Sequence, residues 1–392
     1  MDVQRLGGVV RYLDQVPDPR RFNKTYTVAQ LLIMTLLATL CRCDDYEEIA
    51  GFVAARRDWL GELLDLPEGR TPCRKTFERV LGMLDPEALQ ACFVRLTEAL
   101  AQRSTGRLVA IDGKTLRGSF DHARRQLPIH LVHAWDHANG LMLGQIAVDE
   151  KSNEITAVPA LLELLDLEGA VVSMDAMHCQ KDTAKAVRDA DADYLLAVKG
   201  NHKSLHEDIK LFFDDAIEQN DQQLLTHVME PDNGHGRLDE RTVWATEQIG
   251  WLCRRHPDWI DLRGLVCVEG RRLDFATGKQ SIQRRYYLTS LDPWRVGADQ
   301  LGELVRGHWS VENQLHWCLD VSFADDAARV RKHHGPTNLA AVKRLCLGLL
   351  KRSTPRASTP AKAKRTSLKS RRLLCGWSND YLLQTLTGGD KV

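Results

Sequence analysis

The pattern of apolar and polar positions along the chain changes near residue 106. Before that point, apolar residues recur with the spacing typical of helices. Four stretches show this spacing most clearly: 28–40, 46–56, 76–84 and 86–102. Together they predict an N-terminal helical domain over residues 1–105. The most apolar of the four, 28–40, is too short to span a bilayer, so we interpret it as a buried helix.

After residue 106 the apolar runs become short, as they do in buried strands. There are five such runs, at 108–111, 129–135, 141–148, 170–174 and 194–198. Asn139-Gly140 indicates a hairpin between the second and third, and helical patterns separate the last three. The resulting order is three strands, helix, strand, helix, strand. It predicts an α/β fold with a ribonuclease H-like mixed sheet flanked by helices.

Residues 203–291 interrupt this order, and we interpret them as a β-rich insertion. A helical pattern comes first, at 203–218, and four strand-like runs follow near 224–229, 239–247, 262–270 and 282–291. We therefore expect the catalytic core to consist of 106–202 and 292–350. Residues 351–392 are expected to be a basic linker and a tail, because the stretch 351–372 holds nine Lys or Arg and no acid.

The overall charge limits how a nucleic acid could be bound. Among 392 residues, Lys and Arg number 53 and Asp and Glu number 53, so the formal net charge is zero. A nucleic acid would have to be held by local basic patches. One candidate is the helix start at 71–76, which brings Arg74 and Lys75 to its first turn. A helix-turn-helix DNA reader begins in this way, and so do many bundle helices, so the N-terminal domain is a candidate DNA-binding domain.

The ten cysteines argue for a reducing compartment. They are scattered singly apart from Cys41 and Cys43, and no C-x-x-C pair occurs. A structural zinc site therefore has little support, and unpaired cysteines suit the cytoplasm. Since the sequence also shows no signal-peptide pattern, we expect a cytoplasmic protein that does not enter a membrane.

Two aspartates, Asp112 and Asp175, stand at the carboxyl ends of predicted strands. In the predicted sheet these strands are neighbours, so both carboxylates should point into one place. Carboxylates packed together repel each other unless a cation joins them, and hard oxygen ligands favour Mg²⁺ or Mn²⁺. The alternative for either aspartate alone is a solvated cap at the end of a strand.

A third carboxylate is expected from a later helix. Glu312 lies beside an apolar stripe at helical spacing and between two tryptophans, Trp309 and Trp317, which predicts partial burial and hence a partner. The alternative to a bound metal ion is a simple ion pair between Glu312 and either Arg306 or His316. Three such carboxylates could form a two-metal site for phosphodiester chemistry. Side-chain cations alone would fall short of the roughly 15 kcal/mol by which that barrier must fall.

Several short motifs occur along the chain, and three of them contain Asp112, Asp175 and Glu312. They are Val16–Arg20 (VPDPR), Ile111–Ser119 (IDGKTLRGS), Asp175–Gln180 (DAMHCQ), Val198–Asn201 (VKGN), Gly234–Arg241 (GHGRLDER) and Arg306–Phe323 (RGHWSVENQLHWCLDVSF). This series resembles the DDE transposases of bacterial insertion sequences, most of all their H-repeat-associated subgroup. The match spans nearly the whole chain. One such motif alone would be weak evidence for the family, but the whole set in the family's order is strong evidence.

The resemblance implies a DNA transposition reaction that uses Mg²⁺, with Mn²⁺ as a substitute. Water attacks at the end of the element, and the freed 3′-hydroxyl then attacks the target. Asp112, Asp175 and Glu312 carry over as the catalytic, metal-binding triad. Side chains in or beside the same motifs are expected to contact DNA: Lys114, Arg117, His178, Lys199, Asn201, Arg237, Arg241, Arg306 and His308.

One departure from the wider family affects the last motif. Related enzymes carry a Tyr, an Arg and a Lys around the catalytic Glu, whereas this chain has Val305, His308 and Leu319 at the matching positions. The phosphate contacts of that helix are therefore in doubt, and Arg306 and His308 are the candidate substitutes.

The expected partners are double-stranded DNA, at both element ends and target, and a second copy of the chain in the DNA-bound synaptic complex. The expected location is the bacterial nucleoid. Two rivals stay open. A ribonuclease H-like nuclease would cut without strand transfer, and a silent or domesticated relic would bind DNA without cutting it.

Overall fold

The computed structural model describes residues 3–22, 24–67, 69–101, 104–120, 127–148, 154–234, 236–355 and 366–388. The chain forms two compact units. Unit 1 consists of Met1–Arg103, Gly113–Asn153 and Glu312–Val392, and unit 2 of Ser104–Asp112 and Glu154–Val311. No helix in the described ranges is long and apolar enough to cross a membrane. The four-part division drawn from the sequence stays a prediction.

The first part of unit 1 is helical, as the periodicity predicts. Its helices are α1 (Val3–Leu6), α2 (Val9–Leu13), α3 (Val28–Leu40), α4 (Tyr46–Ala55), α5 (Arg57–Leu64), α6 (Arg74–Met83) and α7 (Pro86–Leu100). Every residue of α3 is buried, which explains why it is apolar on all sides. Thr27 and Gln30 form a reciprocal capping box at its start, so two backbone N–H groups that the helix leaves unpaired are satisfied.

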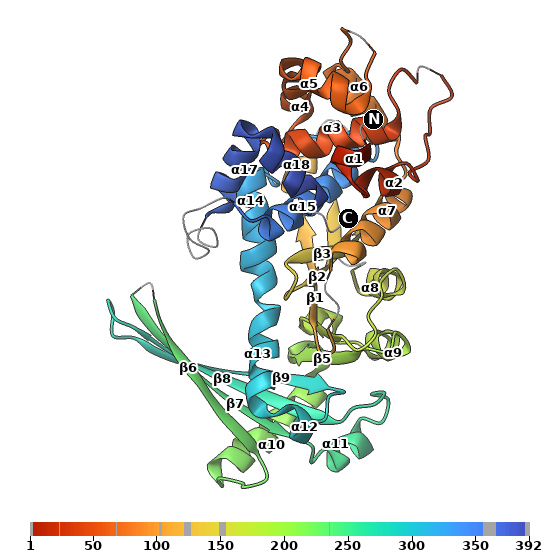
Figure 1. The fold of residues 1–392 in the computed structure, drawn as a ribbon. Coiled ribbons are helices and arrows are strands. Elements are labelled where there is room, and N and C mark those ends of the chain that lie inside the picture. Colours follow the sequence, from red (N-terminus) through yellow and green to blue (C-terminus); the bar gives the residue numbers. More distant parts are fainter. Residues whose placement is uncertain are drawn as a thin grey trace. The chain divides into compact units, whose positions relative to one another are not determined.

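Helix α15 (Gly335–Arg352) is the centre of unit 1. It contacts α3, α6 and α7 (Figure 1). All its residues from Gly335 to Leu350 are buried. Near it lie a π-helical segment, Glu312–His316, and α14 (Trp317–Phe323).

The basic stretch 351–372, predicted as a linker and here called the basic arm, is partly helical. Helices α17 (Leu368–Trp377) and α18 (Asn379–Thr387) end the described chain. Arg371 and Arg372, which the sequence places in the basic arm, are buried and hydrogen-bonded in α17. They contribute to packing there, and the middle of the arm, 356–365, lies outside the described residues.

Unit 1 also holds a β-hairpin. Strands β2 (His130–Asp136) and β3 (Leu141–Val148) pair in antiparallel fashion. The turn between them contains Gly140 with φ of 64°, a conformation that glycine adopts without steric cost. The hairpin predicted from Asn139-Gly140 is thus confirmed.

The parallel strands belong to unit 2, except for the last three residues of the first one, 113–115, which belong to unit 1. β1 (Leu108–Thr115) pairs with β4 (Val171–Met174), and β4 pairs with β5 (Asp193–Val198). Helix α8 (Glu154–Glu163) precedes β4 and helix α9 (Lys181–Asp189) precedes β5. The predicted order of strands and helices over 106–202 is therefore confirmed, and the fold is α/β with a mixed sheet and flanking helices.

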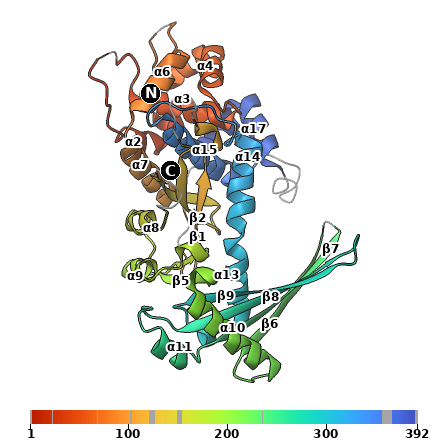
Figure 2. The same ribbon diagram turned by 180° about the vertical axis from the view of Figure 1, so that it is seen from behind.

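The segment after β5 adds four antiparallel strands to the same sheet. Helix α10 (Lys203–Glu218) comes first; then follow β6 (Leu225–Gly234), β7 (Arg237–Thr246), α11 (Gly250–Arg255), β8 (Gly264–Asp274) and β9 (Gln280–Thr289). The last strand, β9, pairs with β5, so unit 2 has the order β1-β4-β5-β9-β8-β7-β6. Figure 2 shows α10 beside this long strand ribbon.

Helices α12 (Pro293–Val296) and α13 (Ala298–His308) follow the ribbon. Leu301, Leu304 and Val305 of α13 are buried against Met229 and Val243 of the strands. Each such aliphatic side chain contributes about 1.5–3 kcal/mol when it leaves water. This packing holds α13 on the face of the β6–β9 strands.

Candidate active site

Asp112 and Asp175 belong to neighbouring strands of unit 2: Asp175 directly follows β4, whereas Asp112 lies within β1, which runs on to Thr115, so the expectation that Asp112 ends its strand is wrong. Ile111 of β1 lies opposite Met174 of β4 in parallel register, so the two aspartates are the next pair along. The side chain of Asp175 is 43% exposed, whereas the four residues of β4 before it are buried. Two adjacent carboxylates on a rigid strand edge are oxygen ligands suited to a hard divalent cation.

Asp175 also organises the loop that follows it. Its Oδ1 accepts hydrogen bonds from the backbone N–H groups of Met177 at 3.1 Å and His178 at 3.4 Å. These bonds cap the 3₁₀ turn η3 (Ala176–His178). One carboxylate oxygen is thereby fixed against the backbone, which limits the rotation of the side chain.

Two histidines, His178 and His308, lie near Asp175. His178 is buried, with its Nε2 3.1 Å from Oε2 of the equally buried Glu154 and 4.0 Å from the Asp175 carboxylate. His308, at the end of α13, has its Nδ1 2.9 Å from Oγ of Ser173 on β4. Burial lowers the pKa of His308 to about 4, so its ring is neutral near pH 7.

The loop after β5 meets the loop after β4. Lys199 and Asn201 are exposed around the turn η4 (Gly200–His202). Nδ2 of Asn201 donates a hydrogen bond to the backbone oxygen of Ala176 at 2.6 Å. The D-A-x-H-x-Q and V-K-G-N motifs, 23 residues apart in the sequence from Asp175 to Val198, are thus joined.

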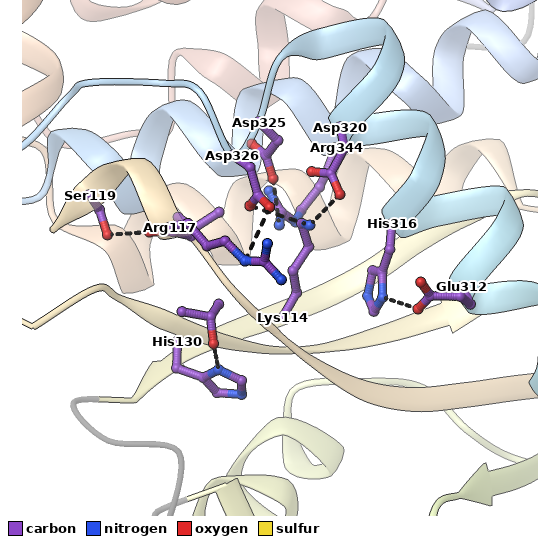
Figure 3. Close-up of polar contacts among 12 residues, drawn as sticks. Lys114, Arg117, Ser119, His130, Glu312, His316, Asp320, Asp325, Asp326 and Arg344 are labelled. Atoms are coloured by element: carbon purple, nitrogen blue, oxygen red, sulfur yellow. Dashed lines mark hydrogen bonds and ion pairs between the residues drawn. The ribbon is translucent and has the colours of Figure 1, made fainter.

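Glu312 belongs to unit 1 and begins the π-helical segment. Its side chain is 66% exposed, and Trp309 and Trp317 are exposed as well, so the partial burial expected from the sequence is wrong. The apolar stripe beside Glu312 packs inward and leaves the carboxylate on the solvent side. Oε2 of Glu312 lies 3.2 Å from Nδ1 of His316 (Figure 3), which is one of the two pairings that the sequence leaves open.

Two basic residues of unit 1 that are predicted to contact DNA, Lys114 and Arg117, lie near the end of β1. Nζ of Lys114 is buried and bound to Asp320 at 2.8 Å and to Asp326 at 3.5 Å (Figure 3). Arg117, on the turn η1 (Arg117–Ser119), is largely exposed and lies 3.5 Å from Asp326. Arg117 therefore presents a guanidinium to solvent, whereas the Lys114 ammonium is engaged within the protein.

The remaining candidates lie on the strand ribbon or face it. Arg237 and Arg241 are on β7, which the sheet order separates from β4 by three strands, so roughly 19 Å at the usual strand spacing of about 4.8 Å. Arg237 is 3.2 Å from Asp239, and Arg306 is 3.6 Å from Asp232. The structure does not bring the two β7 arginines to Asp175. His235 of their motif lies outside the described residues.

Two residues beside the carboxylates were missed by the sequence reasoning. Glu154 lies against His178, and His133 of β2 has its Nε2 2.9 Å from Nε2 of His316. A sequence signal for His133 is its place as a polar residue within the run 129–135, which predicts a buried strand. A buried polar residue needs a partner, and that requirement could have marked it.

Comparisons with known proteins agree with these motifs. Residues 10–97 match the family model described as DDE_Tnp_1-associated, and residues 103–349 match the one described as Transposase DDE domain. The chain is 34% identical to "Putative transposase YncI" of Escherichia coli O157:H7, over 90% of this chain and 88% of that protein. It is 29% identical to "H repeat-associated putative transposase YhhI" of Escherichia coli K12, over 99% of each.

Among solved structures, the chain is similar to a piggyBac transposase in a synaptic complex with hairpin DNA. The identity is 12% and the TM-score 0.38, over 97% of this chain and 78% of that one. A likeness at this level carries no argument about fold or function.

Proposed function

Because the chain belongs to the DDE transposases and is related to their H-repeat-associated members, we propose that it hydrolyses phosphodiester bonds at the ends of an insertion sequence. The freed DNA ends are then joined to target DNA, in a reaction that depends on Mg²⁺ and accepts Mn²⁺. The observation that carries the proposal is the pair of carboxylates, Asp112 and Asp175, that follow a matched pair of residues on two parallel strands.

Asp112, Asp175 and Glu312 are the proposed ligands of the divalent ions. All three are carboxylates, and each is at least partly exposed, so they fit ions that must also meet a DNA phosphate. Bound divalent ions supply activation of the attacking oxygen and neutralisation of charge on the leaving oxygen. The protein contributes rigidity at this site. The strand register and the hydrogen bonds from two backbone N–H groups to Asp175 limit how the Asp175 carboxylate can move.

The DNA contacts are proposed in two groups. Arg117, Lys199 and Arg306 are exposed cations, so they can meet backbone phosphates directly, and Asn201 adds an exposed polar side chain in the loop that holds Lys199. The second group consists of the other residues predicted to contact DNA. Three of them must first leave a partner within the protein: Lys114, His178 and His308. Arg237 and Arg241 lie on β7, away from Asp175. Phosphate contacts position DNA without reading its sequence.

We propose double-stranded DNA as the substrate and a second copy of the chain as the partner, because two element ends must be joined in one reaction. The proposed place of action is the bacterial cytoplasm, at the nucleoid. All ten cysteines are free thiols in the described part of the chain, which suits a reducing compartment.

The test substitutes each ligand by its neutral isostere: Asp112→Asn, Asp175→Asn and Glu312→Gln. Each should lower Mn²⁺-dependent cleavage of a DNA end by at least about a thousandfold, since several kcal/mol of transition-state stabilisation are lost. Binding of the same DNA should be largely unchanged. The matched control is Asp189→Asn on α9, a carboxylate that is exposed and bound to Lys185.

The products separate the rival functions. Cleaved and joined DNA supports the transposase. Metal-dependent nicking without joined products would instead indicate a nuclease, and binding without cleavage would indicate a silent relic. Retained cleavage in one of the three variants would remove that residue from the proposed site.

A further inference from the structure

The carboxylate of Glu312 is the outer end of a chain of three side chains that leads into the core of unit 1. Oε2 of Glu312 lies 3.2 Å from Nδ1 of His316. Nε2 of His316 lies 2.9 Å from Nε2 of His133, which is 183 positions away in the sequence. The two rings meet edge to face, with centroids 5.1 Å apart. His133 is fully buried on β2.

The positions of the ring hydrogens follow from these contacts. One hydrogen must lie between the two Nε2 atoms, because two bare nitrogens or two N–H groups would repel each other at this distance. An ionised carboxylate only accepts hydrogen bonds, so Nδ1 of His316 carries a hydrogen. If His316 is neutral, its Nε2 is bare and accepts from His133. If His316 is charged, its Nε2–H donates instead, and the hydrogen of His133 moves to Nδ1.

The second ring nitrogen of His133, Nδ1, decides between these two arrangements of the hydrogens. Its Nδ1 is buried and has no hydrogen-bond partner among the described residues. A buried N–H group without an acceptor is rarer in proteins than an acceptor without a donor. The arrangement with Nδ1 of His133 bare and Nε2–H donating is therefore favoured.

We propose that His133 is a positioning residue for Glu312: its Nε2–H holds His316 with the hydrogen on Nδ1, and that N–H orients the Glu312 carboxylate for metal binding. This inference rests on the proposed function, because it takes Glu312 as a metal ligand.

Glu312 needs such support because little else restrains it. Its side chain is 66% exposed, and an exposed glutamate has several rotamers to lose before it can bind an ion. It also begins a π-helical segment, a local irregularity that is frequent at functional sites. Hydrogen bonds behind a metal ligand commonly set its orientation, and their loss weakens metal affinity or activity about 10- to 100-fold.

The ring hydrogens can be observed directly in the full chain with ¹⁵N-labelled histidine. Spectra that correlate ring nitrogens with ring C–H groups report which nitrogen is protonated. His316 should be protonated on Nδ1 alone and His133 on Nε2 alone. The signals are assigned from the His133→Gln and His316→Gln variants, in which one set disappears. A hydrogen on Nε2 of His316, or on both of its nitrogens, overturns the proposal.

The positioning role is tested with Mn²⁺ alone, by titrating the full chain and following free Mn²⁺ by electron paramagnetic resonance. His133→Leu removes the donor and should raise the Kd for Mn²⁺ about 10- to 100-fold. The asparagine side chain of His133→Asn is polar but too short to reach Nε2 of His316, so this variant should raise the Kd for Mn²⁺ as His133→Leu does. It replaces the leucine variant if that variant does not fold. His133→Gln can place an N–H there and should stay within about threefold of wild type.

The control is His130→Leu on the same strand. His130 is also buried, but its Nδ1 is 2.8 Å from Oγ1 of Thr115, whereas the ring of His133 contacts His316. This variant should keep the wild-type Kd, so equal effects of His130→Leu and His133→Leu would show that general loosening of the strand is responsible and would contradict the proposal.

Failure of this inference and failure of the proposed function give different results. A wild-type protein that neither binds Mn²⁺ nor cleaves DNA contradicts the proposed function, and the ring spectra then decide the hydrogen assignment by themselves. A wild-type protein that binds and cleaves, with His133→Asn and His133→Leu no weaker than His130→Leu, contradicts only the positioning role.

Discussion

At the scale of single residues, Gly118 shows why the motif Ile111–Ser119 carries a glycine near its end. It lies in the turn η1, three positions after the end of β1. A Cβ atom at Gly118 would lie 2.3 Å from the backbone oxygen of Ala328 and 2.9 Å from that of Asp326. Both obstacles are backbone atoms, so they cannot rotate away. The glycine allows the segment around Asp326 to approach β1, where Asp326 binds Lys114 and Arg117.

Gly118→Ala should therefore lower the free energy of unfolding by about 1–3 kcal/mol, the usual effect of an inserted methyl group that forces backbone to shift. The measurement is urea denaturation followed by circular dichroism. Gly51→Ala is the control, because Gly51 is exposed on α4 with no atom within 4 Å of its added Cβ. Its helix should gain up to about 1 kcal/mol, and a similar loss in both variants would contradict the steric argument.

At the scale of elements, helix α17 is tied to the rest of unit 1 by Arg372. This fully buried guanidinium contacts Asp44 at 2.6 Å and the backbone oxygen of Thr39 at 2.6 Å. It also donates to the backbone oxygen of Ser322 and lies over the ring of Phe323, 4.1 Å from its centroid. The end of α3, the end of α14 and α17 are thus joined by one side chain.

Replacing Arg372 by Met should lower the free energy of unfolding by about 3–5 kcal/mol, because the Asp44 carboxylate loses its partner in a largely buried place. Differential scanning calorimetry measures the effect. Lys369→Met, on the exposed side of the same helix, should change stability by no more than about 0.5 kcal/mol. A small effect of Arg372→Met would mean that α17 is held by its apolar contacts instead.

At the scale of the whole molecule, the neutral net charge makes any DNA binding depend on local clusters. Two cations at the ends of the basic stretch 351–372 are engaged within the protein: Arg371 is hydrogen-bonded to backbone oxygens of Leu350 and Ser353, and the Lys351 ammonium lies 4.9 Å from the ring centroid of Trp135. Lys369 is exposed on α17. Four further cations of the stretch lie outside the described residues: Arg356, Lys362, Lys364 and Arg365.

Changing these four residues to Gln should flatten the dependence of DNA affinity on salt. Each cation that meets a phosphate contributes about 0.9 to the slope of log K against log salt, so the slope should fall by up to about 3.6. Fluorescence anisotropy at several salt concentrations measures it. Changing Arg57, Lys185 and Arg295, which are exposed elsewhere, is the control, and an equal change of slope would show that the arm has no special part.

The elements of this fold could be predicted because helices and strands impose different local periods on apolar residues. The stretch 28–40 became α3 with the predicted bounds, and the run before Asp112 became β1. The order of these elements was enough to place Asp112 and Asp175 on neighbouring strands, since parallel strands joined through a helix leave few topologies. The choice of Glu312 rested more on the family motifs than on the local pattern, whose prediction of partial burial is wrong.

What the local pattern did not contain was the pairing of distant residues. The addition of β9 to β5, the bond between Lys114 and Asp320 and the contact of His133 with His316 join positions far apart in the chain. The exposure of Glu312 is of the same kind, because solvent access depends on which neighbours the fold supplies. By itself the sequence determined the elements and singled out three candidate carboxylates, and only the tertiary structure decided which buried polar groups stand behind them, because hydrogen-bond partners are chosen by proximity in space.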